Sequence, residues 1–303
     1  MLVIRMAGGL GNQFYRYAFG KYLERSYAQS VKYDVSWFDN IHSIDHDINY
    51  LDDFYTDYEI ANQFDLNRVR PPEVLDRNIA WFLAKQLPML KPIIAATTGL
   101  IYETPLGQMS MITPGPYRNL THDFNFKSHR DYYLVGYWQS YEYTNEHRQE
   151  LCDELTPKKI SETTKEIVAR FDSGEYVSVH FRKTDSGKGG NTEFLWYRQA
   201  LDHLLAEYPE AIFVVFSNDI PWVKDHVQLP NTTIFFDHTD HRSAAEDIYA
   251  MSRCSHNIIA ASTFSWWGAY LNENPEKTVI APRWWGSIDI STTDKCPESW
   301  VLI

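Results

Sequence analysis

From residue 158 to residue 281 the sequence alternates without interruption between patterns typical of helices and of strands. The expected elements are helix 158–171, strand 175–181, helix 194–207, strand 211–217, helix 220–227, strand 232–236, helix 243–253, strand 256–260, helix 264–273 and strand 277–281. Strict alternation of this kind predicts a parallel, doubly wound sheet. Ligands of such sheets bind at the carboxyl ends of the strands, so candidate functional residues are sought there.

The first half of the chain is less regular and opens with one clear α/β unit. A buried strand over 2–6 leads through a glycine turn over 7–12 into a helix over 13–27. Further elements are expected at helix 77–87, strand 100–103, strand 132–137 and helix 142–155, which stops at Thr156-Pro157. With 303 residues, the chain is expected to form two α/β domains, 1–156 and 157–303, that face each other across a cleft.

The charge balance of the chain limits its expected partners. The net charge is −12, with 40 acidic against 28 basic residues. Such a balance repels nucleic acid and anionic lipid, so a phosphate-bearing ligand would be met by a few local donors. Nucleic acid is therefore not an expected partner.

The cysteines and the apolar segments indicate the compartment. Cys152, Cys254 and Cys296 are odd in number and far apart in the sequence, which is typical of reduced thiols. The apolar run at residues 1–6 is too short for a signal peptide, and no run approaches the roughly 20 apolar residues that span a bilayer. We therefore expect a cytoplasmic protein without an integral membrane segment, either free or peripheral to the inner membrane.

The glycine turn between the first strand and the first helix reads Gly8-Gly9-Leu10-Gly11-Asn12-Gln13. A nicotinamide fingerprint of the form GxGxxG would need glycine at position 14, where Phe14 stands. The glycines allow close backbone approach and leave N–H groups at a helix N-terminus, which suits a phosphate or a sugar hydroxyl. The predicted ligand-binding residues here are Gly9, Gly11, Asn12 and Gln13.

A second candidate segment is the strand 175–181, which ends in a run of polar residues at 180–185. Alternation along a strand sends His180 and Arg182 to the same side, where both can reach one ligand. The arginine offers a planar, permanently charged fork suited to phosphate. The alternative is an Arg182–Asp185 ion pair that only caps the edge of the sheet.

A third candidate segment is the start of the helix that follows strand 256–260. The residues concerned are Ser262, Thr263, Phe264 and Ser265. A helix that begins here presents hydroxyl groups and unpaired N–H groups, which together can bind a phosphate. An ordinary N-cap by Ser262 or Thr263 is the structural alternative, and it is compatible with the binding role.

Two acidic clusters imitate metal sites. Asp45-His46-Asp47 is one, and the other comprises Asp237, His238, Asp240 and His241. Both fall in expected loops and lack the helical spacing of a two-histidine site, so each is interpreted as a solvated acidic turn. No metal site is predicted.

Taken together, these segments resemble the α-1,2-fucosyltransferases of glycosyltransferase family 11 and, more distantly, the α-1,6- and protein O-fucosyltransferases. The resemblance rests on five blocks in the family's order: GGLGNQFYRYAFG at 8–20, GYWQSYEY at 136–143, HFRKTD at 180–185, FSND at 216–219 and EDIYAMSRCSHNIIAASTFSWWGAYLN at 246–272. The blocks cover both expected domains, and their combination is specific.

The resemblance implies a GT-B-like fold of two Rossmann-type domains, with GDP-fucose held mainly by the C-terminal one and without a bound metal or other cofactor. It assigns Arg182 to the β-phosphate, His180 and Asp247 to the guanosine end, and the hydroxyls of Thr263 and Ser265 to the pyrophosphate. Asn218, from the block at 216–219, completes the predicted donor-binding set. An arginine and a helix N-terminus can neutralise a departing diphosphate without a metal.

The chain departs from the family pattern after Arg182. Where many members read HxRRGDY, this sequence has Lys183, Thr184 and Ser186, and a glycine-rich stretch follows. A Thr-Asp pair with a later glutamate is similar to the α-1,6 branch, in which a glutamate after this motif is the base. Asp185 and Glu193 are therefore both candidates for the general base, and the linkage stays open between galactose O2 and another position.

On the acceptor side, Tyr137, Trp138 and Gln139 are expected to line the pocket, because sugar faces stack on aromatic rings, and packing in the core is the alternative for Tyr137. The predicted reaction is an inverting displacement in which a hydroxyl of a galactose-containing glycan, such as a bacterial surface polysaccharide, attacks fucose C1 as GDP leaves. Two alternatives are a non-catalytic nucleotide-sugar or glycan-binding protein and a nicotinamide-dependent oxidoreductase, which Phe14 disfavours.

Overall fold

The computed structural model describes residues 1–39, 48–69, 111–112, 131–182, 191–237, 243–285 and 288–303. Within it the chain forms two compact units, one of residues 1–49 and 57–148, the other of residues 50–56 and 149–303. The expected domain boundary at 156–157 thus falls inside the second unit. Helix 77–87 and strand 100–103 lie outside the described residues.

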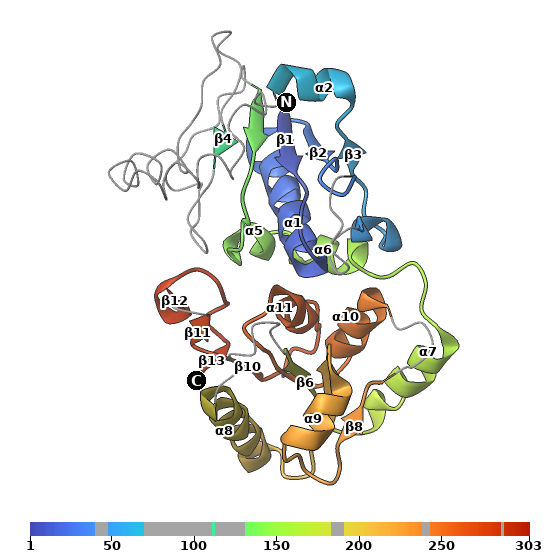
Figure 1. The fold of residues 1–303 in the computed structure, drawn as a ribbon, viewed down its shortest axis with the longest axis vertical. Coiled ribbons are helices and arrows are strands. Elements are labelled where there is room, and N and C mark those ends of the chain that lie inside the picture. The colour runs from blue at the N-terminus through green and yellow to red at the C-terminus, as the bar shows by residue number, and fades with distance from the viewer. Residues whose placement is uncertain (40–47, 70–110, 113–130, 183–190, 238–242, 286–287) are drawn as a thin grey trace. The chain divides into compact units, whose positions relative to one another are not determined.

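The first unit is built on a five-stranded sheet in the order β3-β2-β1-β5-β4 (Figure 1). Its strands, all paired in parallel, are β1 (Leu2–Arg5), β2 (Val31–Asp34), β3 (Glu59–Ile60), β4 (Met111–Ile112) and β5 (Tyr132–Leu134). The helices are α1 (Leu10–Tyr27), α2 (Gln63–Val69) and α5 (Glu142–Asn145). Central β1 is fully buried over Leu2–Ile4, as expected for a parallel strand covered on both faces.

The second unit contains a six-stranded sheet in the order β13-β10-β9-β6-β7-β8, again parallel throughout. The strands are β6 (Tyr176–Phe181), β7 (Ile212–Ser217), β8 (Ile234–Phe235), β9 (His256–Ile258), β10 (Val279–Ala281) and β13 (Val301–Leu302). The helices are α6 (Arg148–Glu154), α7 (Glu162–Val168), α8 (Asn191–Glu207), α9 (Ile220–His226), α10 (Ala244–Ser252) and α11 (Thr263–Tyr270). Separately from the sheet, β11 (Trp284–Trp285) forms a small antiparallel pair with β12 (Ile288–Asp289). The predicted doubly wound parallel sheet is confirmed.

Alternating side chains of the central strands build a core on each face of this sheet. Val179 and Phe181 of β6 pack with Leu201 and Leu204 of α8 on one face. On the other face, Val214 and Phe216 of β7 pack with buried residues of α10, among them Met251. Helices therefore cover both faces, which fixes the carboxyl ends of the strands as the open edge.

Strand order reverses once in each sheet. In the second unit β6, β7 and β8 run outward to one side and β9, β10 and β13 to the other, so the reversal lies between β6 and β9. In the first unit it lies between β1 and β5. Ligands of open α/β sheets bind at such reversals, beyond the carboxyl ends of the strands.

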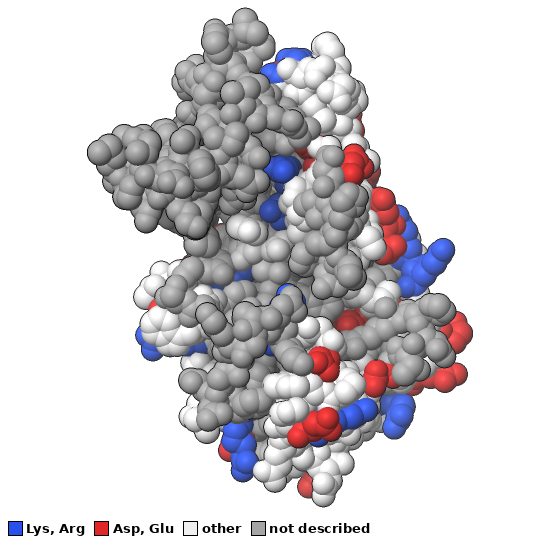
Figure 2. Space-filling view, viewed as in Figure 1, with Lys and Arg blue, Asp and Glu red and all other residues white. Residues whose placement is uncertain are grey.

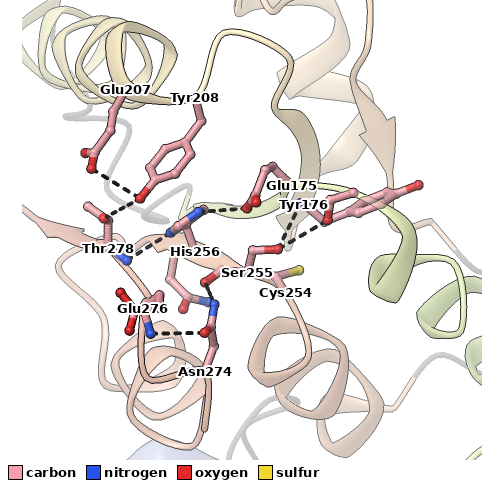
Figure 3. Close-up of polar contacts among 12 residues, drawn as sticks. Glu175, Tyr176, Glu207, Tyr208, Cys254, Ser255, His256, Asn274, Glu276 and Thr278 are labelled. Atoms are coloured by element: carbon pink, nitrogen blue, oxygen red, sulfur yellow. Dashed lines mark hydrogen bonds and ion pairs between the residues drawn. The ribbon is translucent and has the colours of Figure 1, made fainter.

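At the amino ends of the strands, His256 links three segments of the second unit (Figure 3). Its Nδ1 accepts a hydrogen bond from the backbone N–H of Thr278 at 2.9 Å, and its Nε2 lies 3.0 Å from Glu175 Oε2. The Thr278 bond leaves the ring proton on Nε2, which donates to the carboxylate. The ring also packs on Tyr208, with centroids 4.0 Å apart.

The structure differs from expectation at several element boundaries. The expected helix 142–155 is divided into α5 and α6, and the expected helix 158–171 is shortened to α7, which begins after the Ser161 N-cap. Helix α1 begins at Leu10, inside the expected glycine turn, because Gly9 takes the extended N-cap conformation. Short strand β2 was not predicted.

Charged side chains are mixed rather than segregated. On the face shown in Figure 2, Lys and Arg lie among Asp and Glu, and the described residues of that face form no continuous basic field.

Candidate functional site

The carboxyl end of β6 divides its side chains between the core and the open edge. Phe181 is buried, with its ring centroid 4.3 Å from that of Tyr197 on α8. The Tyr197 hydroxyl donates to the backbone carbonyl of His180 at 2.8 Å, which fixes the strand end. His180 is also buried, whereas Arg182 is exposed. The strand therefore presents a buried imidazole and, two residues later, an accessible guanidinium.

Arg182 makes no ion pair or hydrogen bond with any residue that the structure describes. Its expected alternative partner, Asp185, lies outside the described residues. No described residue therefore uses the N–H donors of this exposed arginine, which lies at the reversal of strand order.

The start of α11 is held by its own hydroxyl groups. Ser262 is the N-cap, and its Oγ accepts from the Phe264 N–H at 3.3 Å. Ser265 Oγ accepts from the Ala260 N–H at 3.2 Å and donates to the Ser262 carbonyl at 3.4 Å. Both serines are buried, while Thr263 is half-buried. Of the three predicted hydroxyls, that of Thr263 is the accessible one, and the two serines shape the turn.

The ends of β6 and β9 meet through an aromatic contact. The ring centroids of His180 and Phe264 lie 5.6 Å apart, so the helix N-terminus after β9 sits beside the polar end of β6. The structure therefore brings together two of the three predicted segments at the β6–β9 reversal of strand order.

The remaining predicted donor residues of the second unit lie on neighbouring elements. Asn218 is exposed directly after β7, and the next residue, Asp219, caps α9. Asp247 is buried in the first turn of α10, beside Glu246, whose carboxylate accepts from the Ser161 N–H at 2.5 Å.

In the first unit, the glycine turn joins β1 to an α1 N-terminus that lacks a side-chain cap and an acidic first turn. Gly8 has φ +75°, in the left-handed region that favours glycine. Gln13 is fully buried, and its Nε2 donates to the carbonyls of Gly8 at 2.8 Å and Ile48 at 2.9 Å. Gln13 thus supports the turn from inside, while Gly9 and Asn12 are half-buried beside it.

Arg16 was missed by the sequence analysis. Its Nη1 donates to the carbonyls of Ala7 at 2.8 Å and Asn12 at 3.1 Å, which bracket the glycine turn. Burial lowers the pKa of this guanidinium to about 10, Tyr137 acts in the opposite direction, and Arg5 lowers it further. The available signal was its spacing four residues after Asn12, which places the two residues on one face of α1.

The loop after β5 separates two aromatic residues that were both expected to line the acceptor side. Trp138 has φ +54° and is buried, stacked on Phe19 at 4.1 Å. Tyr137 is 50% exposed, and its ring centroid lies 5.4 Å from the Arg16 guanidinium carbon. Of the predicted acceptor-side pair, Tyr137 is therefore accessible and Trp138 belongs to the core. Gln139 donates through Nε2 to Asn12 Oδ1 at 2.8 Å.

The side chains of both candidates for the general base lie outside the described part of the structure. Asp185 lies outside the described residues, and Glu193 falls within α8 at a position whose side chain is not described. Among described side chains, no group of three or more His, Cys, Asp or Glu is arranged to hold a metal ion. The clusters at 45–47 and 238–241 lie outside the described residues.

Two further expectations concern thiols and membranes. Cys152, Cys254 and Cys296 are all buried and form no disulfide. Burial raises the pKa of the Cys296 thiol to about 11 and that of Cys254 still higher. None of the helices in the described parts of the chain is both long and apolar enough to span a membrane.

The whole chain is similar to characterised sugar transferases. An α-1,2-colitosyltransferase of Escherichia coli is 27% identical, over 100% of this chain and 99% of that protein. The O-antigen biosynthesis glycosyltransferase WbnK of Escherichia coli is 28% identical, over 92% of this chain and 93% of its own length.

Solved structures support the fold class. The crystal structure of the fucosyltransferase NodZ from Bradyrhizobium superposes with a TM-score of 0.50 at 12% identity, covering 88% of this chain and 91% of NodZ. The two parallel α/β units are therefore of the GT-B class.

Residues 113–303 match the model of glycosyl transferase family 11. Because that match spans more than half of the sequence, the chain belongs to glycosyl transferase family 11.

Proposed function

We propose that the protein transfers L-fucose from GDP-β-L-fucose to a glycan hydroxyl, galactose O2 in the first instance, with inversion at the anomeric carbon. The observation that carries this proposal is the exposed Arg182, which has no ion-pair partner among the described residues. It lies two residues after His180, whose ring contacts Phe264 in the first turn of α11. An exposed guanidinium and a helix N-terminus on one sheet edge suit a diphosphate leaving group.

Stabilisation of departing GDP is the proposed centre of the mechanism. As the bond from fucose C1 to the phosphate oxygen breaks, negative charge develops on the β-phosphate. Arg182 neutralises that charge, and the half-buried Thr263 contributes a hydroxyl and the end of a helix dipole. These groups carry the metal-independent reaction that we propose.

The acceptor oxygen attacks C1 from the opposite face and loses its proton to a carboxylate. Asp185 and Glu193 are the two candidates for that base. On the acceptor side, the half-exposed Tyr137 offers its ring for stacking against a sugar face. A transfer to another position, as in α-1,6 linkages, is the alternative that the sequence around Asp185 favours.

A second donor, GDP-colitose, is favoured by the full-length similarity to an α-1,2-colitosyltransferase. Colitose is L-fucose without the 3-hydroxyl group, so the two sugars differ by one hydrogen-bonding group. A site built to bind that hydroxyl would strongly prefer fucose, whereas an apolar site would discriminate weakly.

The test uses purified full-length protein with GDP-fucose or GDP-colitose, with EDTA or Mg²⁺, and with galactose-terminated acceptors. Products are analysed by mass and linkage. A deoxyhexose added at galactose O2 in EDTA supports donor, linkage and metal independence together. If only GDP-colitose is used, it replaces GDP-fucose as the proposed donor. If transfer requires Mg²⁺, the proposed metal independence is overturned. Nucleotide binding without transfer favours a non-catalytic binding protein.

The biological setting is proposed from the relatives. WbnK is an O-antigen biosynthesis enzyme, so an oligosaccharide of a bacterial surface polysaccharide is the proposed acceptor class. The cytoplasmic location expected from the sequence stays a prediction.

A further inference from the structure

The reversal of strand order in the first unit brings two distant segments into contact. Asn12 lies in the first turn of α1, which the glycine turn joins to β1, and Gln139 follows β5, the strand beside β1. Gln139 Nε2 donates to Asn12 Oδ1 at 2.8 Å. The two residues are 127 positions apart in the chain, so this bond depends on the tertiary fold.

Every group of Asn12 except its amide nitrogen is held inside the protein. Its backbone N–H donates to the Gly9 carbonyl at 2.9 Å, and its own carbonyl accepts from Arg16 Nη1 at 3.1 Å. Its Oδ1 is occupied by Gln139. Within the described residues nothing accepts from Nδ2, and the side chain is half-buried.

Gly8 leaves the space next to this amide nitrogen open. A Cβ added at Gly8 would lie 3.1 Å from Asn12 Nδ2, and Gly8 already has φ +75°. The turn thus combines a left-handed glycine with an amide whose oxygen accepts from Gln139 and whose two N–H donors are used by no described residue.

Arg16 fixes the main chain beneath the amide. Arg16 is buried, with 6% of its surface exposed, and among the described residues it contacts no carboxylate and its Nε has no hydrogen-bond partner. Burial of a cation is unfavourable by itself, and the two hydrogen bonds to the carbonyls of Ala7 and Asn12 offset part of this cost. The same two bonds hold both ends of the turn in place.

We propose that Gln139 is a positioning residue that sets the orientation of the Asn12 amide, so that Nδ2 donates to an oxygen of the bound nucleotide sugar. Arg16 holds the backbone of the same turn. This inference rests on the proposed function, because it assigns Asn12 to that donor. An amide has an acceptor oxygen on one side and an NH₂ group with two donors on the other. Turning the Asn12 amide over would therefore present Oδ1, an acceptor, to the ligand in place of the two donors of Nδ2.

The substitution Gln139→Glu reverses the pattern while keeping the side-chain length. A glutamate can only accept when ionised, so Asn12 must turn Nδ2 inward and Oδ1 toward the ligand. A merely structural role for Gln139 predicts the same loss of activity whatever residue stands at position 12. A positioning role predicts that the loss disappears when position 12 has no amide.

The experiment is a double-mutant cycle of wild type, Gln139→Glu, Asn12→Ala and the double variant, with kcat/KM for the nucleotide sugar as readout. We expect each single variant to lose about tenfold or more, and Gln139→Glu to change the Asn12→Ala protein by less than about twofold. Gln63→Glu, an exposed change on α2 of the same unit with the same charge difference, should leave kcat/KM within about twofold of wild type. Thermal unfolding of all five proteins separates loss of fold from loss of orientation.

Equal losses from Gln139→Glu in both backgrounds overturn the inference, as does an Asn12→Ala protein with wild-type kcat/KM. If the wild type transfers no sugar from any nucleotide sugar, the proposed function fails separately. In that case the affinity of the same four proteins for GDP is measured by calorimetry. If the effects of the substitutions at positions 12 and 139 on this affinity are coupled, the inference is supported, and if they are additive, it is overturned.

Discussion

The hydroxyl group of Tyr33 lies in the space where a side chain of residue 20 would begin. A Cβ added at Gly20 of α1 would be 1.9 Å from Tyr33 Oη and 2.7 Å from Cζ of the same ring. The Tyr33 hydroxyl donates to the Tyr17 carbonyl at 3.1 Å, in a fully buried bond. The helix therefore approaches β2 at backbone distance, and Gly20 is required for that approach.

We expect Gly20→Ala to destabilise the first unit. In an open helix this change gains about 1 kcal/mol from propensity, but here the methyl group displaces Tyr33 and breaks its buried bond. The net expectation is a loss of about 1–3 kcal/mol in the free energy of unfolding, measured by urea titration. Adding Tyr33→Phe removes the closest atom and should recover part of the loss. A Gly20→Ala protein as stable as wild type would contradict the close approach.

Much of the second unit could be predicted from its sequence because its signals are local. The run Val177-Ser178-Val179-His180-Phe181 is apolar enough for a strand buried on both faces, and the confirmed β6 contains it. The serine at 262 likewise marks the start of α11. Shorter elements were missed, because four residues such as those of β2 carry too little periodicity to separate a strand from a loop.

The candidate site could be predicted only in part. Arg182 follows β6 directly and is exposed, and the half-buried Thr263 opens α11 after β9, so both positions agree with the sequence pattern. Arg16 and Gln139 have roles that depend on contacts made only after β5 pairs with β1. Trp138 has a positive φ and is buried, so that only Tyr137 of the two expected acceptor-side aromatic residues is accessible.

His256 is expected to stabilise the amino ends of the strands chiefly through Thr278. Replacing it with Phe keeps a ring against Tyr208 but removes the acceptor of the Thr278 N–H, for an expected cost of about 1–3 kcal/mol. Glu175 is 51% exposed, so Glu175→Gln should cost less than about 1 kcal/mol. Chemical unfolding of both variants measures the two costs, and a larger effect at position 175 would contradict this order.

Arg182→Ala should impair catalysis without affecting stability. Loss of one charge at a developing anion costs on the order of 3 kcal/mol, or about 100-fold in kcat, with a smaller change in KM. Arg182→Lys keeps the charge but not the planar fork and should recover part of the rate. The unfolding midpoint should stay unchanged, because Arg182 is exposed and contacts no described residue. Arg170→Ala, at another exposed position of the second unit, is the matched control. A loss below about tenfold would remove Arg182 from the leaving-group role.

The stability of the first unit should decrease in mild acid because of His147. His147 is buried, with 8% of its surface exposed, and its ring lies beside that of Tyr22, with centroids 6.4 Å apart. Burial, reinforced by Arg25, holds the pKa of His147 below its ordinary value of 6.5, against a smaller opposing effect of Glu146. The unfolded chain therefore binds a proton at a higher pH than the folded one.

Burial of the neutral His147 ring therefore contributes fully to the stability of the folded protein above pH 6.5, the pKa of the unfolded state. This contribution is lost as the pH falls from 6.5 toward the lower pKa of His147 in the folded state. His147→Phe removes the titrating group, so the stability of the variant relative to wild type should rise on going from pH 7 to pH 5, by at most about 1.4 kcal/mol per pH unit. Urea unfolding at several pH values measures this difference, and His203→Phe, which removes an exposed histidine of the second unit, is the control. A wild-type-minus-variant difference that does not change between pH 7 and pH 5 would show that burial of His147 does not disfavour its protonated form.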